Sequence, residues 1–302
     1  MELRQLKYFL KASETLNFSE AAKALFITQS TLSQQIRQLE NEMGVTLFER
    51  NSHEVSLTEV GIQLQPYAQQ AIAAADACMQ QAYDLNNLLI GELNIGVTFT
   101  FSPLLTETVL AFAKEYPHVH INIFYKTMTE LMEMLQHREV DFVLAFKPTE
   151  RYDRIESHVL FNNRLTVVVN QSHPLATKKS ITIDDLQAYE CAMPAKGLQA
   201  RNSLDDQLAS FFHKMNIRIE LNDVNILLKL IKQSKLVTVL AEATIHDEDD
   251  LVAIPLEMPD NNMEGCIHVL KQSYVKASAK EFCKQLCHSR AILKYSSLAN
   301  IL

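Results

Sequence analysis

Polar side chains recur between positions 29 and 37 at a spacing that places them on one side of a helix. These residues are Gln29, Ser30, Thr31, Ser33, Gln34 and Arg37. An amide can bond adenine through two hydrogen bonds, a hydroxyl can donate or accept, and a guanidinium suits guanine or phosphate. A face that only has to stay in solution usually carries Lys and Glu instead. The segment therefore predicts a helix that reads base edges in the major groove of DNA, with a merely solvated face as the alternative.

Short amphipathic segments would position this helix. Apolar residues recur at helical spacing over 3–15, which predicts a first helix, and Ser19 is the expected N-cap of a short second helix. Phe26 and Ile27 form a turn, and Thr28 is expected to cap the third helix. The expected inner stripe of that third helix consists of Leu32, Ile36 and Leu39. Two short helices joined by a tight turn form the helix-turn-helix pattern of DNA-binding proteins.

A small hairpin is expected directly after Gly44. Two strand-like pieces, VTLFER and VSL, flank the polar stretch NSHE and indicate a wing. Arg50 and His53 are the wing residues that we expect to contact DNA. Residues 1–60 carry six basic side chains against eight Glu, so their side-chain charge is about −2. Since nonspecific affinity comes from neutralising phosphates, specific binding would depend on base contacts and on dimer geometry.

A long helix, rich in Ala and Gln, is expected from Thr58 to about Asn87. Pro66 lies inside this segment and is expected to bend the helix. One side of the helix carries Leu64, Ala68, Ala71, Ala75, Cys78 and Ala82. Residues three and four apart share a helix face, and small side chains let a second helix approach it closely. This side is therefore the predicted dimer seam.

From Gly91 the sequence alternates between strand-like and helix-like segments. The strand-like runs are LNIGV, VHINIFY, VDFVLAF, LTVVV, IRIEL, LVTVLA and CIHVL. The helices expected around them cover 104–115, 129–136, 203–215, 225–233 and 277–288. Strands that alternate with helices are typical of mainly parallel sheets, so we predict an α/β class for this part of the chain.

The chain resembles the LysR-type transcriptional regulators along nearly its full length. The run LRQLKYFLKASETLNFSEAAKALFITQSTLSQQIRQLENEMGVTLFER is similar to the family's winged helix-turn-helix, and SLTEVG is similar to the entry of its linker helix. GELNIGV, EVDFVLAF and VVVNQSHPLA are similar to landmarks of its effector domain. TFTFSPLL, VDFVLAFKP and KQSKLVTVLAEATI look more like the branch that contains the cyanate-operon regulator.

The resemblance implies a domain organisation. It consists of an all-α winged helix-turn-helix at 1–58, a linker and dimerisation helix at 59–89, and an effector-binding domain at 90–302. The effector domain is expected to look like a periplasmic binding protein, with two α/β lobes connected by two crossovers. Lobe one would comprise 91–164 and 266–302, and lobe two 165–265. The family also implies a homodimer that pairs into a homotetramer, as a dimer of dimers.

The effector site is expected at the carboxyl ends of strands, where helix N-termini face the cleft between the lobes. Thr98 and Thr100 follow one strand and open a helix, and Thr129 is expected to cap another helix. The further candidates for effector contact are Phe146, Lys147, Gly197, Gln199, Arg201 and Asn225. Free backbone N–H groups with threonine hydroxyls would form a neutral cradle for a small anionic effector. The alternative is that these threonines are ordinary helix caps.

Composition bounds the class of protein. With 302 residues, a net charge of −8 and 47% hydrophobic residues, the chain predicts two or three globular domains without a general basic coat. It has no apolar run of about 20 residues and no signal peptide, which predicts a cytoplasmic protein. Its five scattered cysteines form no disulfide framework. No nucleophile–base pair, metal cluster or cofactor loop stands out, so we expect no enzyme, no metal and no cofactor.

The sequence thus predicts a transcriptional regulator that binds double-stranded promoter DNA and is controlled by a small molecule. The ligand would act through its different affinity for two arrangements of the lobes. The remaining alternative is a small-molecule-binding protein whose DNA binding is weak or lost, and the acidic 1–60 segment keeps this alternative open.

Overall fold

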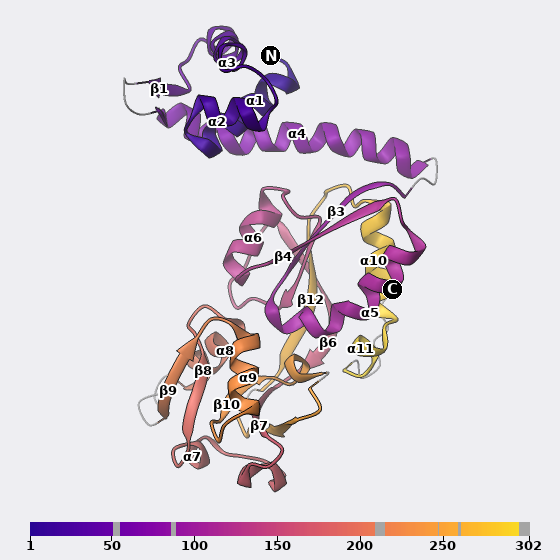
Figure 1. The fold of residues 1–302 in the computed structure, drawn as a ribbon. Helices are drawn as coiled ribbons and strands as arrows, with labels where there is room; N and C mark the ends of the chain where they lie inside the picture. The colour runs from indigo at the N-terminus through magenta and orange to yellow at the C-terminus, as the bar shows by residue number, and fades with distance from the viewer. Residues whose placement is uncertain (51–54, 86–88, 209–214, 247, 259–260, 296–302) are drawn as a thin grey trace. The chain divides into compact units, whose positions relative to one another are not determined.

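The chain forms two compact units in the computed structural model, 1–88 and 89–302, which we call the N-terminal and C-terminal units (Figure 1). The structure describes residues 1–50, 55–85, 89–208, 215–246, 248–258 and 261–295. The predicted fold class is confirmed: a helical winged unit with a long helix is followed by a two-lobed α/β unit. Within the described residues, no helix combines the length and the apolar character needed to cross a membrane.

The N-terminal unit packs three helices, a two-stranded wing and a long helix around one core. Its elements are α1 Leu3–Thr15, α2 Phe18–Ala24, α3 Gln29–Met43, β1 Phe48–Arg50, β2 Val55–Leu57 and α4 Glu59–Leu85. Strands β1 and β2 pair antiparallel, as expected for a hairpin. The predicted inner stripe of α3 is confirmed, because Leu32, Ile36 and Leu39 are fully buried in the core of this unit.

Helix caps in this unit match the prediction at one site and differ at another. The hydroxyl of Thr28 accepts a hydrogen bond from the N–H of Thr31 at 3.2 Å, so Thr28 caps α3 as predicted. The predicted cap Ser19 is wrong for α2. The Asn17 side chain accepts from the N–H groups of Ser19 and Glu20 at 2.9 and 3.2 Å, so the helix already begins at Phe18.

Part of the predicted dimer seam on α4 packs inside its own unit instead. Ala68 is buried, and Leu64 and Ala71 pack against the same core, because α4 lies along α1. The apolar residues left exposed on α4 include Tyr67, at 68% exposure, and Cys78. Cys78 belongs to the predicted seam and Tyr67 lies beside it, so the exposed apolar side of α4 coincides with the predicted seam only in part. The helix continues through Pro66, since α4 is unbroken from Glu59 to Leu85.

A five-stranded sheet forms lobe one of the C-terminal unit. Its strands are β3 Gly91–Val97, β4 Val119–Tyr125, β5 Phe142–Phe146, β6 Ile155–Asn163 and β12 Met263–Leu270. They follow the order β4-β3-β5-β12-β6, so the late strand β12 lies between β5 and β6 (Figure 1). The helical elements of this lobe are η1 Phe99–Phe101, α5 Ser102–Glu115, α6 Met128–Gln136, α10 Ala277–Cys287 and α11 Arg290–Leu293.

Lobe two is built from the strands between β6 and β12. Strand β7 Leu165–Asn170 lies between β10 Thr238–Ala241 and β11 Leu251–Pro255, and β8 Glu190–Pro194 pairs with β9 Asn216–Leu221. A parallel bridge from Cys191 to Val237 connects β8 to the start of β10. The helical elements are η2 Pro174–Thr177, α7 Ile183–Leu186, α8 Gln199–Leu208, α9 Val224–Lys232 and η4 Glu242–Ile245.

The prediction of mainly parallel sheets is wrong. Strand β3 is parallel to β4 and β5, and β8 is parallel to β9, but β12 is antiparallel to both β5 and β6. Both β10 and β11 are antiparallel to β7. The reason is that β7 and β12 enter their sheets after the chain changes lobes, not after a helical crossover. Since β12 begins at Met263, the second change of lobe also precedes the expected residue 266.

Candidate nucleic-acid interface and ligand cleft

Helix α3 presents most of the predicted DNA-reading residues to solvent. Gln29, Ser30, Thr31, Gln34 and Arg37 are exposed, whereas Ser33 is half-buried. At the N-terminus of α3 the Thr28 hydroxyl lies 2.9 Å from that of Ser30 and 2.8 Å from that of Thr31. The fold thus turns amides, hydroxyls and one guanidinium outward while the apolar stripe holds the helix to the core.

The two predicted wing contacts fall at the edge of the described structure. Arg50 is the last residue of β1, where its backbone pairs with Val55 of β2. His53 lies outside the described residues. Neither position therefore adds to the geometry of the α3 surface, and their contact with DNA stays a prediction.

An inner cavity lies between the lobes of the C-terminal unit. Its volume is about 20 Å³, which is room for about one water molecule. Several helices begin at this cavity, since its lining comes from η1 and the first residues of α6, α8 and α9. The lining residues are Thr98, Phe99, Thr100, Lys126, Thr127, Met128, Pro194, Gly197, Leu198, Gln199, Ala200, Val224 and Leu240.

The predicted Thr98 and Thr100 both line this cavity. The N–H of Thr98 donates to the Leu144 carbonyl at 3.0 Å, whereas its hydroxyl is 3.5 Å from the same oxygen, at the limit of a hydrogen bond. The ring of Phe99 stacks on Tyr125 with centroids 5.5 Å apart, which fixes the turn between the two threonines. The Thr98 hydroxyl therefore retains most of its capacity to bond a ligand.

Backbone donors converge on the same cavity. Among the residues that the structure describes, no hydrogen bond engages the N–H groups of Phe99, Thr100, Met128 and Ala200. Each belongs to the first turn of a helical element, where N–H groups have no partner within the helix. The positive ends of the α6 and α8 dipoles add to this effect. The cavity is thus rich in donors that would suit an anion.

Charged side chains near the cavity are already paired. Lys126 is the cation in the described lining, and its ammonium lies 3.3 Å from the Glu130 carboxylate. Hydrogen bonds from the hydroxyl and the N–H of Thr127, with that from Lys126, lower the pKa of Glu130 to about 2. Thr127 and Glu130 form a capping box, so Thr127 and not the predicted Thr129 caps α6.

An outer groove of about 600 Å³ opens beside the inner cavity. The predicted Thr129, Phe146, Lys147, Gly197 and Gln199 line it. The Lys147 ammonium pairs with the Glu264 carboxylate at 2.5 Å, and this hydrogen bond raises the pKa of Lys147. Gly197 has a φ of +93°, which glycine adopts without strain where the chain enters α8.

Gln199 connects the lobes across this cleft. Its Oε1 accepts from the N–H of Phe146 at 3.1 Å, and its Nε2 donates to the Phe146 carbonyl at 3.0 Å. The amide of α8 in lobe two thus pairs with the backbone at the end of β5 in lobe one, much as a neighbouring strand would. We call this pair of hydrogen bonds the Gln199 clamp. Gln199 lines both the inner cavity and the outer groove, so the clamp lies at their boundary.

Two predicted effector residues serve lobe two instead. Arg201 is buried, and it donates to Asp205 at 2.8 Å, to Glu220 at 2.9 Å and to the Pro194 carbonyl at 3.1 Å. Its role in the cleft is therefore corrected to one of holding α8 on β8 and β9. Asn225 is absent from the described lining of both cavities. The N–H of Asn225 instead donates at 2.8 Å to the side chain of Asp223, which caps α9.

Sequence reasoning missed several residues of the inner cavity. Lys126, Thr127, Leu198, Ala200 and Val224 line it without having been predicted. A signal existed for Thr127, because Thr followed three residues later by Glu is the capping-box pattern and places a helix N-terminus there. The remaining four carry no local signal, since their position depends on how the two lobes pack.

Family models match both units. The "Bacterial regulatory helix-turn-helix protein, lysR family" model matches residues 3–62, and the "LysR substrate binding domain" model matches residues 86–289. The "Transcriptional dual regulator GltC" of Bacillus subtilis is 30% identical over 285 residues, which cover 93% of this chain and 95% of that protein.

Solved structures share the fold at low sequence identity. A full-length OxyR variant from Pseudomonas aeruginosa has a TM-score of 0.70 at 21% identity and covers 99% of this chain and 96% of that one. Full-length CbnR complexed with its target DNA has a TM-score of 0.65 at 20% identity, over 95% of this chain and 99% of that one. The Synechocystis PCC6803 CcmR regulatory domain in complex with 2-PG has a TM-score of 0.58 at 20% identity. The match covers 66% of this chain and 96% of that one.

Proposed function

Because the chain belongs to the LysR family of transcriptional regulators, we propose that its inner cavity holds a small anion and that the anion controls DNA binding through α3. The family assignment makes the protein a DNA-binding regulator with an effector-binding domain. The chemistry of the effector, the residues that contact it and the residues that read DNA are our proposal. The alternative of a binding protein without DNA binding is not favoured by this family membership.

The observation that carries the proposal is the convergence of unpaired N–H groups at the inner cavity. Donors from η1, α6 and α8 face the same space, and the hydroxyls of Thr98 and Thr100 add to them. Helix N-termini bind anions through such groups. The lining cation Lys126 is already paired with Glu130, so the site suits a small carboxylate or phosphate ester recognised by neutral donors. The bound 2-PG named for the CcmR domain agrees with this class of ligand.

Binding would change the lobe arrangement, because the inner cavity is too small for such a ligand as it stands. Its volume of about 20 Å³ accepts about one water molecule, so a ligand must separate the elements around it. The Gln199 clamp holds one of these elements, α8, to the end of β5 in the other lobe. An effector that binds the open arrangement more tightly would shift the population toward it, in proportion to its difference in affinity.

We further infer that the protein acts as a dimer, and that two dimers form a homotetramer, as the family suggests. We place it in the cytoplasm, where the DNA lies. The exposed apolar side of α4, with Tyr67 and Cys78, would join two N-terminal units. Two copies of α3 would then meet two half-sites, whose spacing the dimer fixes. The named relatives are regulators, and we propose no catalysis.

A ligand screen followed by calorimetry tests the site. Small carboxylates, sulfate and phosphate esters would be screened by thermal shift, and the strongest would be titrated into wild type, Thr98→Val and Thr100→Val. Valine keeps the shape of threonine but lacks the hydroxyl. Each variant should lose about 0.5–1.5 kcal/mol of binding free energy for a neutral acceptor, or about 1.5–3 kcal/mol for a charged one. Basal DNA binding should persist in both variants.

Two outcomes other than the expected one are distinguishable. Wild-type ligand affinity in both variants would place the effector elsewhere. An equal loss of ligand binding and basal DNA binding would show that the substitutions damage the fold and do not report on the cavity.

A further inference from the structure

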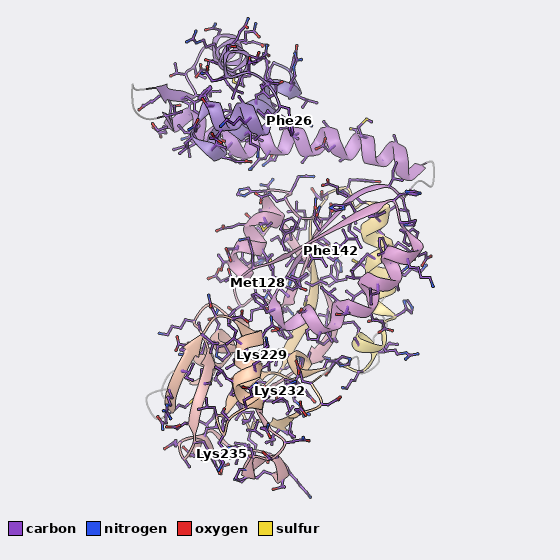
Figure 2. All side chains as sticks on the ribbon, viewed as in Figure 1. Phe26, Met128, Phe142, Lys229, Lys232 and Lys235 are labelled. Atoms are coloured by element: carbon purple, nitrogen blue, oxygen red, sulfur yellow. The ribbon has the colours of Figure 1, made fainter. Side chains whose placement is uncertain are left out.

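Phe26 is the most exposed large apolar side chain of the N-terminal unit, at 96% exposure. The other phenylalanines of the unit, Phe9, Phe18 and Phe48, are buried and contact one another edge to face. Phe26 lies between α2 and α3, and Figure 2 labels it. A solvated phenyl ring on a short turn needs a reason, because burial of such a ring is usually a major stabilising contribution.

The backbone at this turn makes phenylalanine a poor choice. The N–H of Ile27 donates to the Ala22 carbonyl at 3.0 Å, and the N–H of Phe26 donates to the Lys23 carbonyl at 3.1 Å. These two bonds form a Schellman motif, which requires a left-handed residue after the helix and favours Gly or Asn there. Phe26 indeed has a φ of +55°, in the region that bulky side chains avoid. Both the strain and the exposure would be relieved by glycine.

Phe26 lies close in the chain to the residues of α3 that are predicted to contact DNA. It precedes Thr28, the cap of α3, and the exposed Gln29, Ser30 and Thr31 of the first turn. In a helix-turn-helix, the N-terminal residues of the second helix approach the base edges. Lys23, one turn earlier, is also exposed, and its ammonium pairs with the exposed Glu20, so phosphate can compete for it. Phe26 thus lies just before the helix that our proposed function places in the major groove.

We propose that Phe26 is a DNA-contacting residue, whose ring packs on apolar groups at the edge of the major groove, either a thymine methyl or a deoxyribose. This inference rests on the proposed function of α3. DNA is the occupant that the observations favour, because the exposed Phe26 lies two residues before Thr28, the cap of α3. The acidic 1–60 segment also offers few phosphate contacts, so apolar contacts would contribute a larger share of the specific affinity.

The test uses the full-length protein and a duplex that it selects from a random-sequence DNA pool. Phe26→Gly should lower the affinity for this duplex about tenfold, as expected when a contact that buries about half of the phenyl ring against DNA is lost. The same variant should raise the unfolding midpoint, because glycine suits the left-handed backbone. Opposite changes in stability and in affinity would separate a lost contact from a damaged fold. Phe26→Leu should retain most of the affinity.

Leu16 provides a matched control. It ends α1 with a φ of +47° and is also exposed, but it lies in the turn between α1 and α2. Leu16→Gly should therefore stabilise the unit and leave DNA affinity unchanged. Replacing thymines of the selected duplex by deoxyuridine identifies the DNA group. If wild type loses affinity and Phe26→Gly does not, the ring contacts a methyl group; if both are insensitive, it contacts deoxyribose.

Two failures are distinguishable. If Phe26→Gly binds the selected duplex as tightly as wild type does, the ring does not contact DNA and this inference is overturned, while the role of α3 is untouched. If wild type enriches no sequence from the pool, then the proposed function of α3 fails together with the inference.

Discussion

Replacing Gln199 by Ala should loosen the two lobes of the C-terminal unit without unfolding either of them. The clamp consists of two neutral hydrogen bonds, at 3.1 and 3.0 Å, between the Gln199 amide and the Phe146 backbone. Each such bond contributes about 0.5–1.5 kcal/mol net, so the pair contributes about 1–3 kcal/mol to the closed arrangement. This corresponds to a roughly 5- to 150-fold shift in the equilibrium between closed and open lobes.

Hydrogen–deuterium exchange reads this contact directly. The Phe146 N–H is the donor that Gln199 accepts, so peptides covering 142–148 should exchange faster in Gln199→Ala, by a factor within that range. Gln199→Glu should behave similarly or worse, because a carboxylate cannot donate to the Phe146 carbonyl and would repel it. Gln187→Ala is a matched control, since that amide donates to the exposed Asp184 on α7 and, among the described residues, does not bridge the lobes.

Effector binding gives a second readout of the same change. If the ligand binds an opened cavity, removing the clamp lowers the work of opening, and the affinity of Gln199→Ala should rise. If the ligand instead bound the closed arrangement, its affinity would fall by a similar factor. Unchanged exchange at 142–148 together with unchanged ligand affinity would refute the reasoning, because the clamp would then have no effect on the equilibrium between closed and open lobes.

Three further predictions concern other parts of the molecule. Gln34→Ala should relax discrimination at one base pair by about 1–3 kcal/mol with unchanged folding, because Gln34 is exposed on α3; equal competition by random DNA before and after the change would contradict this. Tyr67→Glu should weaken self-association in sedimentation velocity, since Tyr67 is exposed whereas Ala71 packs in its own unit; an unchanged oligomer would disprove the seam. Burial lowers the pKa of His268 from 6.5 to about 4, so its protonation opposes folding, and about 3 kcal/mol of stability should be lost as the pH falls from 6.5 to 4. His268→Gln should show a flatter pH profile in urea unfolding, and an unaltered profile would argue against this assignment.

The N-terminal unit was largely predictable, because its helices are amphipathic and the signals for a helix come from residues that are close together in the sequence. The period of Leu32, Ile36 and Leu39 determined which side of α3 is buried, and hence which side is free. The error at the α2 cap has a physical cause. Asn17 and Ser19 are both good capping residues, and only the hydrogen bonds of Asn17 in the folded chain distinguish them.

The sheets were less predictable, because strand direction depends on long-range topology. Strand β6 Ile155–Asn163 was missed since polar residues interrupt its apolar pattern, and β11 Leu251–Pro255 follows an acidic stretch that reads as a loop. No local signal shows that β12 will enter between β5 and β6. The order of strands follows from two changes of lobe, and these leave no mark in the periodicity of any single strand.

Some site residues could likewise be placed from the sequence, whereas others depend on contacts that form only in the folded chain. Thr98 and Thr100 could be placed from sequence, since the end of a strand before a helix locates them at a cleft. Arg201 could not, because a basic residue in a loop-like segment looks equally suited to a ligand. Its partners Asp205 and Glu220 become its neighbours only when α8 and β9 form. Gln199 was placed at the cleft correctly, but its bond to Phe146 depends on both lobes.

The position of β12 also sets an order of events during synthesis. Lobe one cannot complete its sheet until residues 263–270 have left the ribosome, yet its other four strands end at Asn163. The intervening stretch of about 100 residues takes roughly 5–20 s to translate. Lobe two lies within this stretch, and its described strands pair only with one another, so it can fold while lobe one waits. During this interval β5 has an unpaired edge and β6 has no partner strand in its sheet, which makes the nascent chain most open to aggregation between the emergence of residues 163 and 270.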